Sequence, residues 1–217
     1  ILAALERARR TGEGQQVDIS MLDCQVALLE NALARYAVSG EVPQPLGSRH
    51  PAITPFQFFA ASDGYIVLAA GNDGLWQKLC AALQMPNLAI DPRFIDNALR
   101  TENHAELEPL LAAVLKERTV VEWCAVLGEA GVPSGPLCDV GDVFANEQVA
   151  ARDMIVEIDH PVAGRQAMPN SPLKFSQTPI NLETPAPLLG QHTDEVLSQI
   201  LGLAEDEIAE LRAEGVI

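Results

Sequence analysis

The turn Gly71-Asn72-Asp73-Gly74 is the first feature of this chain that could take part in chemistry. It follows an apolar run and precedes a helical pattern, so its backbone N–H groups could receive an anion at the start of a helix. The same residues also form an ordinary junction between a strand and a helix, in which Asn72 or Asp73 caps the helix. The sequence leaves both interpretations open.

Arg49 and His50 stand side by side in a proline-rich segment. Histidine titrates near neutral pH, so His50 could act as an acid or a base, although a loop histidine bonded to the backbone is the alternative. Arg49 and Lys174 could each meet a phosphate, although single basic residues are usually plain surface residues. These side chains do not specify a reaction by themselves.

The histidines and cysteines form no ligand set in the sequence. The histidines are spread out, and the cysteines contain no CxxC pair (His50, His104, His160, His192; Cys24, Cys80, Cys124, Cys138). We therefore expect no metal site and reduced thiols in a cytoplasmic protein. Glycine-rich nucleotide loops, HExxH and GxSxG are absent from the sequence as well.

The composition limits the partners. The chain has 217 residues, 48% of them hydrophobic, and a net charge of −16. This acidity disfavours nucleic acid or an anionic membrane surface, because phosphate binding needs clustered Lys and Arg. No apolar run approaches the ~20 residues that cross a bilayer. The chain begins inside a helical pattern, so we expect it to be the C-terminal part of a longer protein.

A hairpin followed by a helix must position the first turn. Phe56–Phe59 is typical of a strand, Ser62-Asp63-Gly64 of a turn, and Tyr65–Ala70 of a strand covered on both faces. The helix after Gly74 carries Leu75, Leu79 and Leu83 on one stripe, beside Trp76 and Cys80.

Other elements follow from hydrophobic period and capping residues. The sequence predicts a strand over 16–20, helices over 20–39 and 97–116, a helix capped by Thr119 and Glu122, a stiff turn over 131–136, short helices after Asp139 and over 147–152, a strand over 154–159, and two helices after His192. Proline-rich passages at 41–55 and 164–187 interrupt this order.

These passages predict five segments. Residues 1–40 form part of a large domain, 41–55 a linker, 56–159 a small α/β domain, 160–187 a return linker, and 188–217 the C-terminal helices of the large domain.

The segment Thr11–Asp23, TGEGQQVDISMLD, resembles the TGxGQxVDxSMLD signature of the family III CoA-transferases. Further matches follow in the family's order: His50-Pro51, Asp63-Gly64, Gly71-Asn72 with Trp76, Asp91-Pro92-Arg93-Phe94, Gly131-Val132-Pro133 with Gly135-Pro136, and Leu189-Gly190-Gln191-His192-Thr193. The resemblance covers essentially the whole chain.

The resemblance implies an α/β fold, with a small α/β domain between two linkers, C-terminal parts of a Rossmann-like large domain, and an interlocked homodimer. It implies CoA transfer between an acyl-CoA donor and a small carboxylic acid through an aspartyl-CoA intermediate. A coenzyme A thioester is then the substrate, and no cofactor is bound. The family aspartate lies upstream of residue 1, so no catalytic residue is assigned here; Asp18 and Asp23 match signature positions instead.

Four residues are the expected substrate-binding contributions: Met21, Arg49, His50 and Asn72. The segment before the hairpin holds one glycine, Gly47, where formyl-CoA transferase has a mobile glycine-rich loop. Two alternatives stay open, an acyl-CoA racemase of the same fold and a non-catalytic dimerisation or binding fragment. Without the aspartate, we expect the fragment alone to be inactive.

Overall fold

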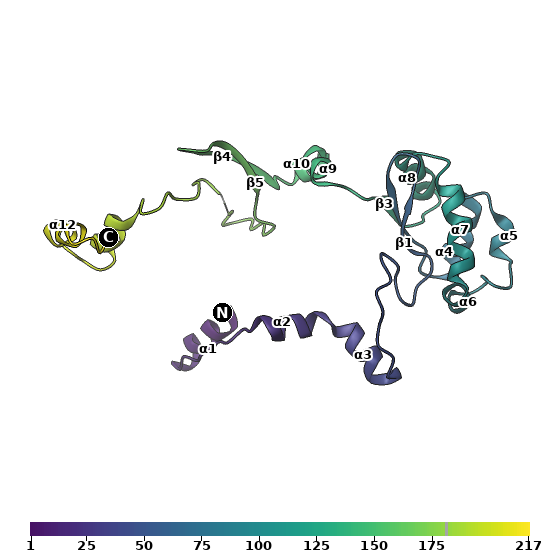
Figure 1. Cartoon of the computed structure of the whole chain (residues 1–217), viewed down its shortest axis with the longest axis horizontal. Helices are drawn as coiled ribbons and strands as arrows, with labels where there is room; N and C mark the ends of the chain where they lie inside the picture. Colours follow the sequence, from purple (N-terminus) through teal and green to yellow (C-terminus); the bar gives the residue numbers. More distant parts are fainter. Residues whose placement is uncertain (181) are drawn as a thin grey trace. The chain divides into compact units, whose positions relative to one another are not determined.

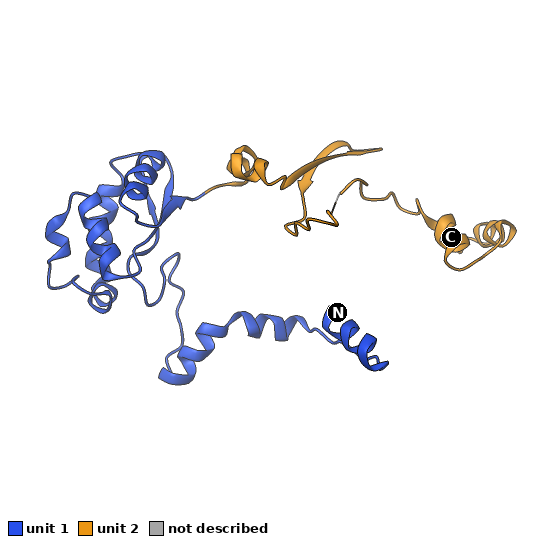
Figure 2. Cartoon of the chain, turned by 180° about the vertical axis from the view of Figure 1, so that it is seen from behind, with its two compact units in different colours: residues 1–137 blue, residues 138–217 orange. Residues whose placement is uncertain are grey.

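The computed structural model describes residues 1–180 and 182–217 (Figure 1). The chain divides into two compact units, residues 1–137 and 138–217 (Figure 2). Among the described residues, no helix is both long enough and apolar enough to cross a membrane. The predicted division into five segments stays a prediction.

The sheet of the first unit is antiparallel, in the order β1-β2-β3 (β1, Phe56–Ala60; β2, Tyr65–Ala69; β3, Ser134–Pro136). The predicted hairpin is confirmed, with Phe58 opposite Val67. The third strand pairs Ser134 with Leu68, within the segment expected to be a stiff turn. A strand of this length that contains glycine and proline has no recognisable strand pattern in the sequence, because both residues are unfavourable inside strands.

Only one face of strand β2 is buried. Ile66 and Leu68 are fully buried, whereas Tyr65 is 50% exposed. The expectation that β2 is covered on both faces is therefore wrong. In β1, Gln57 and Phe59 point inward because side chains alternate along a strand.

Five helices complete the core of this unit: α4 (Asp73–Ala82), α5 (Pro86–Ala89), α6 (Asn97–Glu102), α7 (His104–Leu115) and α8 (Val120–Glu129). Buried side chains of α4, α7 and α8 join those of the sheet in one cluster. The single helix predicted over 97–116 is interrupted at Asn103, whose amide group donates to the carbonyl of Leu99. Local side-chain bonding of this kind competes with helix continuation.

The guanidinium group of Arg100 connects separate parts of this core. It donates to the carbonyl of Thr54 at 2.8 Å, to the carbonyl of Phe94 at 3.1 Å and to the carboxylate of Asp73 at 2.8 Å. It also lies 5.1 Å from the ring centroid of Trp76. The side chain is fully buried, so these bonds satisfy it inside the core.

The capping of α8 follows its sequence. The hydroxyl of Thr119 accepts from the N–H of Glu122, and the carboxylate of Glu122 accepts from the N–H of Thr119, which confirms the predicted capping box. Asp63, in the hairpin turn, accepts from the N–H of Val120 at 2.8 Å. The turn is thereby fixed to the start of α8.

Three helices precede the core: α1 (Leu2–Thr11), α2 (Met21–Leu28) and α3 (Glu30–Ser39). None of their residues is buried. The predicted strand at 16–20 is wrong, because this segment pairs with no strand of the described chain, and Ile19 is 71% exposed. The predicted long helix is two helices that meet at Leu29.

The second unit holds a hairpin of β4 (Ile155–His160) and β5 (Gly164–Pro169) and four helices: α9 (Val140–Ala145), α10 (Glu147–Ala151), α11 (Thr193–Gln199) and α12 (Glu205–Ala213). The predicted helices and β4 are confirmed, but β5 replaces the start of the extended passage expected from 164 onward. Ile158 and Ile208 are the buried side chains of this unit among the described residues.

Candidate functional site

A cavity of 510 Å³ lies in the first unit between the loop before β1, the hairpin and α7. Ligand pockets have volumes of about 300–1,000 Å³. We call this cavity the Arg49 cavity. It is lined by Pro45, Leu46, Gly47, Ser48, Arg49, Gln57, Phe58, Tyr65, His104 and Glu108. Its polar groups come from the loop, from β1 and from α7, which packs against β1.

The loop is held in place by backbone bonds. The N–H of Arg49 donates to the carbonyl of Leu46 at 3.3 Å, and Gly47 between them has φ +64°. That angle favours glycine, which explains the single glycine at this turn. The N–H of Phe58 donates to the hydroxyl oxygen of Ser48 at 3.4 Å, and this bond joins the loop to β1.

The guanidinium of Arg49 forms no ion pair with the carboxylates of the described chain. Its Nη2 donates to the carbonyl of Thr101 at 3.1 Å, whereas its buried Nε has no hydrogen-bond partner among the described residues. It takes part in none of the ion pairs of the described chain. A buried donor without an acceptor is costly, so this guanidinium is suited to an anion.

Three side chains that line the same cavity form a hydrogen-bonded chain. Gln57 donates from Nε2 to the carboxylate of Glu108 at 3.2 Å. Its Oε1 therefore faces Nε2 of His104 at 2.8 Å, and that nitrogen must carry the proton. Nδ1 of His104 then presents a lone pair at 3.6 Å from Glu108.

His104 is held neutral by its surroundings. Burial lowers its pKa, and the positive charge of Arg49 lowers it further, while Glu108 acts in the opposite direction. At neutral pH the cavity therefore contains one cation, Arg49, and one carboxylate, Glu108.

His50 adjoins the cavity lining but is not part of it. Its ring stacks on Phe56 with centroids 5.3 Å apart, and its Nδ1 accepts from the N–H of Ala52 at 3.1 Å. His50 is thus a loop histidine bonded to the backbone, which is the alternative that the sequence left open. Its Nε2 is the nitrogen left for another group.

The other two predicted residues lie outside this cavity. Asn72 is the N-cap of α4, and its side-chain oxygen accepts from the N–H of Leu75 at 2.9 Å. Met21 is the first residue of α2 and is 87% exposed. Of the four predicted residues, the cavity includes Arg49 alone.

Sequence analysis missed Gln57, His104 and Glu108 as members of one site. Two signals were present. The spacing of His104 and Glu108 places them on one helix face, and Gln57 is a polar residue among aromatic ones on the buried side of a strand. A polar side chain in that position needs a partner, but the sequence does not say which helix provides it.

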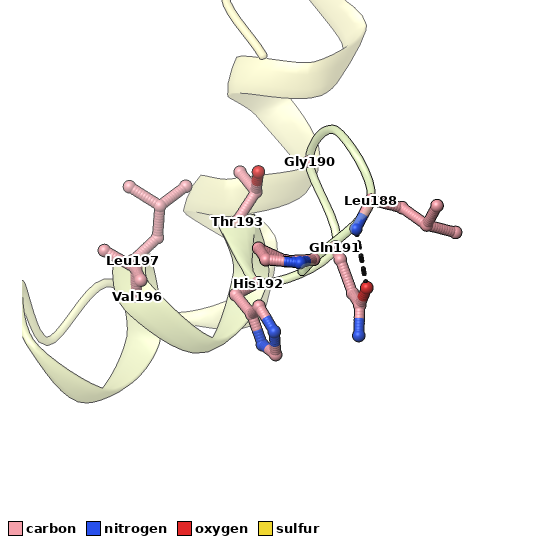
Figure 3. Close-up of a pocket in the computed structure, with 8 residues that line it drawn as sticks. Leu188, Gly190, Gln191, His192, Thr193, Val196 and Leu197 are labelled. Carbon is pink, nitrogen blue, oxygen red and sulfur yellow. Dashed lines mark hydrogen bonds between the residues drawn. The ribbon is translucent and has the colours of Figure 1, made fainter. Parts of the chain in front are cut away.

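A second cavity, of 380 Å³, lies at the start of α11 in the second unit (Figure 3). Two of its polar side chains, Gln191 and His192, already have local partners. The side-chain oxygen of Gln191 accepts from the N–H of Leu188 at 2.8 Å, shown dashed in Figure 3, and Nδ1 of His192 lies 2.9 Å from the carboxylate of Glu195. The Leu189–Thr193 motif therefore builds a turn that leads into α11.

No group of three or more His, Cys, Asp or Glu residues in the described chain could hold a metal ion. Two of the cysteines, Cys80 and Cys124, are shielded from solvent to different degrees, one buried and one half-buried. Burial raises the pKa of the Cys80 thiol to about 12, despite the charge of Arg100 nearby, and also raises the pKa of Cys124.

Comparison with known proteins identifies the family. The family described as CoA-transferase family III matches residues 1–193. The chain belongs to this family. The predicted family membership is therefore confirmed, and with it the mixed helix and sheet fold.

Relatives with named activities match along most of the chain. It is 34% identical over 217 residues to the succinyl-CoA:glutarate CoA-transferase of Mus musculus, covering 100% of this chain and 50% of that protein. It is 39% identical over 176 residues to the acetyl-CoA:oxalate CoA-transferase of Acetobacter aceti, covering 81% and 44%. The chain thus spans about half the length of the curated relatives it matches.

Solved structures of similar fold also match most of the chain. A CAIB/BAIF family protein from Brucella suis superposes with a TM-score of 0.76 at 35% identity, over 91% of this chain and 51% of that one. Rv3272 from M. tuberculosis gives a TM-score of 0.75 at 27% identity, over 89% and 50%.

Proposed function

We propose that the protein carrying this chain transfers CoA from an acyl-CoA donor to a small carboxylic acid. The observation that carries this proposal is the similarity of the whole chain to enzymes named as CoA-transferases, among them succinyl-CoA:glutarate and succinyl-CoA:mesaconate transferases. A CoA thioester is then the substrate, and the acids in those names indicate short dicarboxylic acids as the first candidates to test.

The proposed mechanism uses an aspartate outside this chain, as the family resemblance implies. Its carboxylate attacks the donor thioester, a mixed anhydride forms, and CoA thiolate leaves. The thiolate then attacks the aspartyl carbonyl, releasing the donor acid and leaving an aspartyl-CoA thioester. The acceptor carboxylate attacks this thioester, and the returning thiolate takes the acceptor acyl group and restores the aspartate. Covalent catalysis divides one difficult exchange into easier steps.

The proposed contribution of this chain is to hold the substrate, through Arg49, His50, Asn72 and Met21. Support differs among them: Arg49 has an unpartnered buried donor, and His50 has its Nε2 left for another group, whereas Asn72 already caps a helix. Replacing His50 by alanine tests its part, and an unchanged kcat/KM would remove it from the site.

The proposal includes an interlocked homodimer. Its support is the large amount of apolar side chain left exposed on α2 and α3: Leu22 at 72%, Leu29 at 50% and Leu33 at 46%. Exposed apolar helix faces of this extent are typical of surfaces that pack against further protein.

Hydroxylamine trapping separates the proposal from its alternatives. The whole protein is incubated with succinyl-CoA, treated with hydroxylamine and examined by mass spectrometry for an aspartyl hydroxamate. We expect the adduct, together with transfer of CoA to glutarate. A racemase would instead exchange the α-proton of a branched acyl-CoA without an adduct, and a non-catalytic binding module would do neither.

A further inference from the structure

The Arg49 cavity contains a cation that forms no ion pair within the described chain, beside an apolar wall. We propose that it is the subsite for the free carboxylate of a dicarboxylic substrate, the one that is not joined to CoA. This inference rests on the proposed function for the identity of the ligand, but the subsite itself is argued from the geometry of this chain.

The anion is indicated by the guanidinium. Its Nε is buried and has no acceptor among the described residues, while its Nη2 is oriented by a bond to Thr101. An arginine edge presents two parallel N–H groups, which match the two oxygens of a carboxylate. A carboxylate bound in the cavity would therefore pair with a guanidinium charge that no carboxylate of the described chain pairs with.

A single negative charge is indicated by the rest of the cavity. Glu108 contributes a carboxylate to the lining, and its position is fixed by the amide of Gln57. Neutral His104, on the other side of Gln57, adds no second cation. A single arginine cation compensates the one charge of a carboxylate but leaves a phosphate dianion only half compensated, and Glu108 in the same lining repels a dianion more strongly than a monoanion.

The spacer between the two carboxylates is indicated by the apolar lining. Phe58 and Tyr65 meet edge to face with centroids 5.9 Å apart, and Pro45 and Leu46 also line the cavity. A short run of methylene groups would pack against these side chains, with its far end at Arg49. The hydroxyl of Ser48 accepts from the N–H of Phe58, so its own hydrogen remains to be donated.

Kinetics of the whole protein test the subsite. Succinyl-CoA is the donor, and glutarate is compared with butyrate, which has no second carboxylate. In Arg49→Gln we expect kcat/KM for glutarate to fall about 10- to 100-fold more than that for butyrate, as the loss of a charge-assisted hydrogen bond predicts. Arg49→Lys keeps the charge but loses the two parallel N–H groups of the guanidinium. Its kcat/KM for glutarate relative to butyrate should lie between the values of wild type and Arg49→Gln.

Lys116→Gln is the matched control. It removes one positive charge from an exposed position of the same unit, outside the cavity, and should keep the wild-type ratio of glutarate to butyrate. An equal loss for both acids in Arg49→Gln would overturn the proposal. Replacing the donor by butyryl-CoA shows whether the subsite receives the free carboxylate of the donor, of the acceptor or of both.

A binding readout keeps the test independent of transfer. Histidine NMR follows the titration of His104, whose pKa is lowered partly by Arg49. Glutarate should raise the pKa of His104 by offsetting that charge, and butyrate and inorganic phosphate should do so less. If glutarate leaves the titration unchanged, the subsite is refuted. If wild type moves CoA to no acid while glutarate still shifts His104, the proposed function fails and the subsite stands.

Discussion

At the residue scale, the arginines of this chain separate by what surrounds them. Arg100 is fully buried and each of its three guanidinium nitrogens donates a hydrogen bond, whereas Arg93 is half exposed in ion pairs with Asp91 and Glu106. Arg49 lies between these cases, oriented by one bond and with a buried Nε that has no acceptor among the described residues. The first pattern is typical of a structural arginine and the last of a binding residue.

Arg100→Met should lower the free energy of unfolding by about 2 to 5 kcal/mol, because it leaves the buried carbonyls of Thr54 and Phe94 without a donor. Arg93→Met, at an exposed ion pair, should cost at most about 1 kcal/mol. Urea unfolding followed by tryptophan fluorescence measures both. A loss for Arg100→Met no larger than that of Arg93→Met would show that its bonds contribute little.

The sequence could indicate single residues of the site but not which residues lie beside them. Arg49 and His50 were found as a basic pair in a loop. Which carbonyl orients Arg49, and which histidine lies near it, depends on where α6 and α7 lie in the folded unit, and no local pattern encodes that arrangement. Gln57 could not be assigned to the site for the same reason. Its inward position indicates a binding residue only when His104 and Glu108 are known to lie beside it.

At the element scale, the sequence predicts structure well where the determining groups are neighbours. The capping box of α8 depends on two residues three positions apart, and the hairpin depends on the short turn between its two strands. The failures are non-local. Residues 16–20 alternate as a strand should but have no partner among the described residues, while β5, written GRQAMP, has little strand character and exists because β4 pairs with it.

Asn72 gives a prediction at this scale. Capping α4 requires only its side-chain oxygen, which aspartate also has, whereas the proposed substrate contact would use its amide group. Asn72→Ala should destabilise the protein by about 1 kcal/mol, whereas Asn72→Asp should keep the cap and the stability. Thermal unfolding measures the cap, and CoA transfer is assayed on both variants. If Asn72→Asp transfers CoA normally, the residue acts as a cap; if it is stable but slow, its amide contacts the substrate.

At the scale of the whole molecule, burial is concentrated in one part of the chain. The first buried residue is Thr54, and the buried cluster of the first unit ends at Val132. Both tryptophans, Trp76 and Trp123, lie inside this cluster. Their fluorescence therefore reports the unfolding of this core and of no other part of the described chain.

This distribution predicts that residues 41–137 fold by themselves. Since α1, α2 and α3 bury none of their residues, removing them together with the second unit should shift the tryptophan unfolding midpoint by the equivalent of less than about 0.5 kcal/mol. Leu111→Ala, in the core of α7, should lower the stability of both chains equally, by about 2 to 5 kcal/mol. A short chain without a cooperative transition would show that the core needs its flanks. A normal transition, with equal effects of Leu111→Ala, would establish that the Arg49 cavity is built on a core that folds independently of the segments around it.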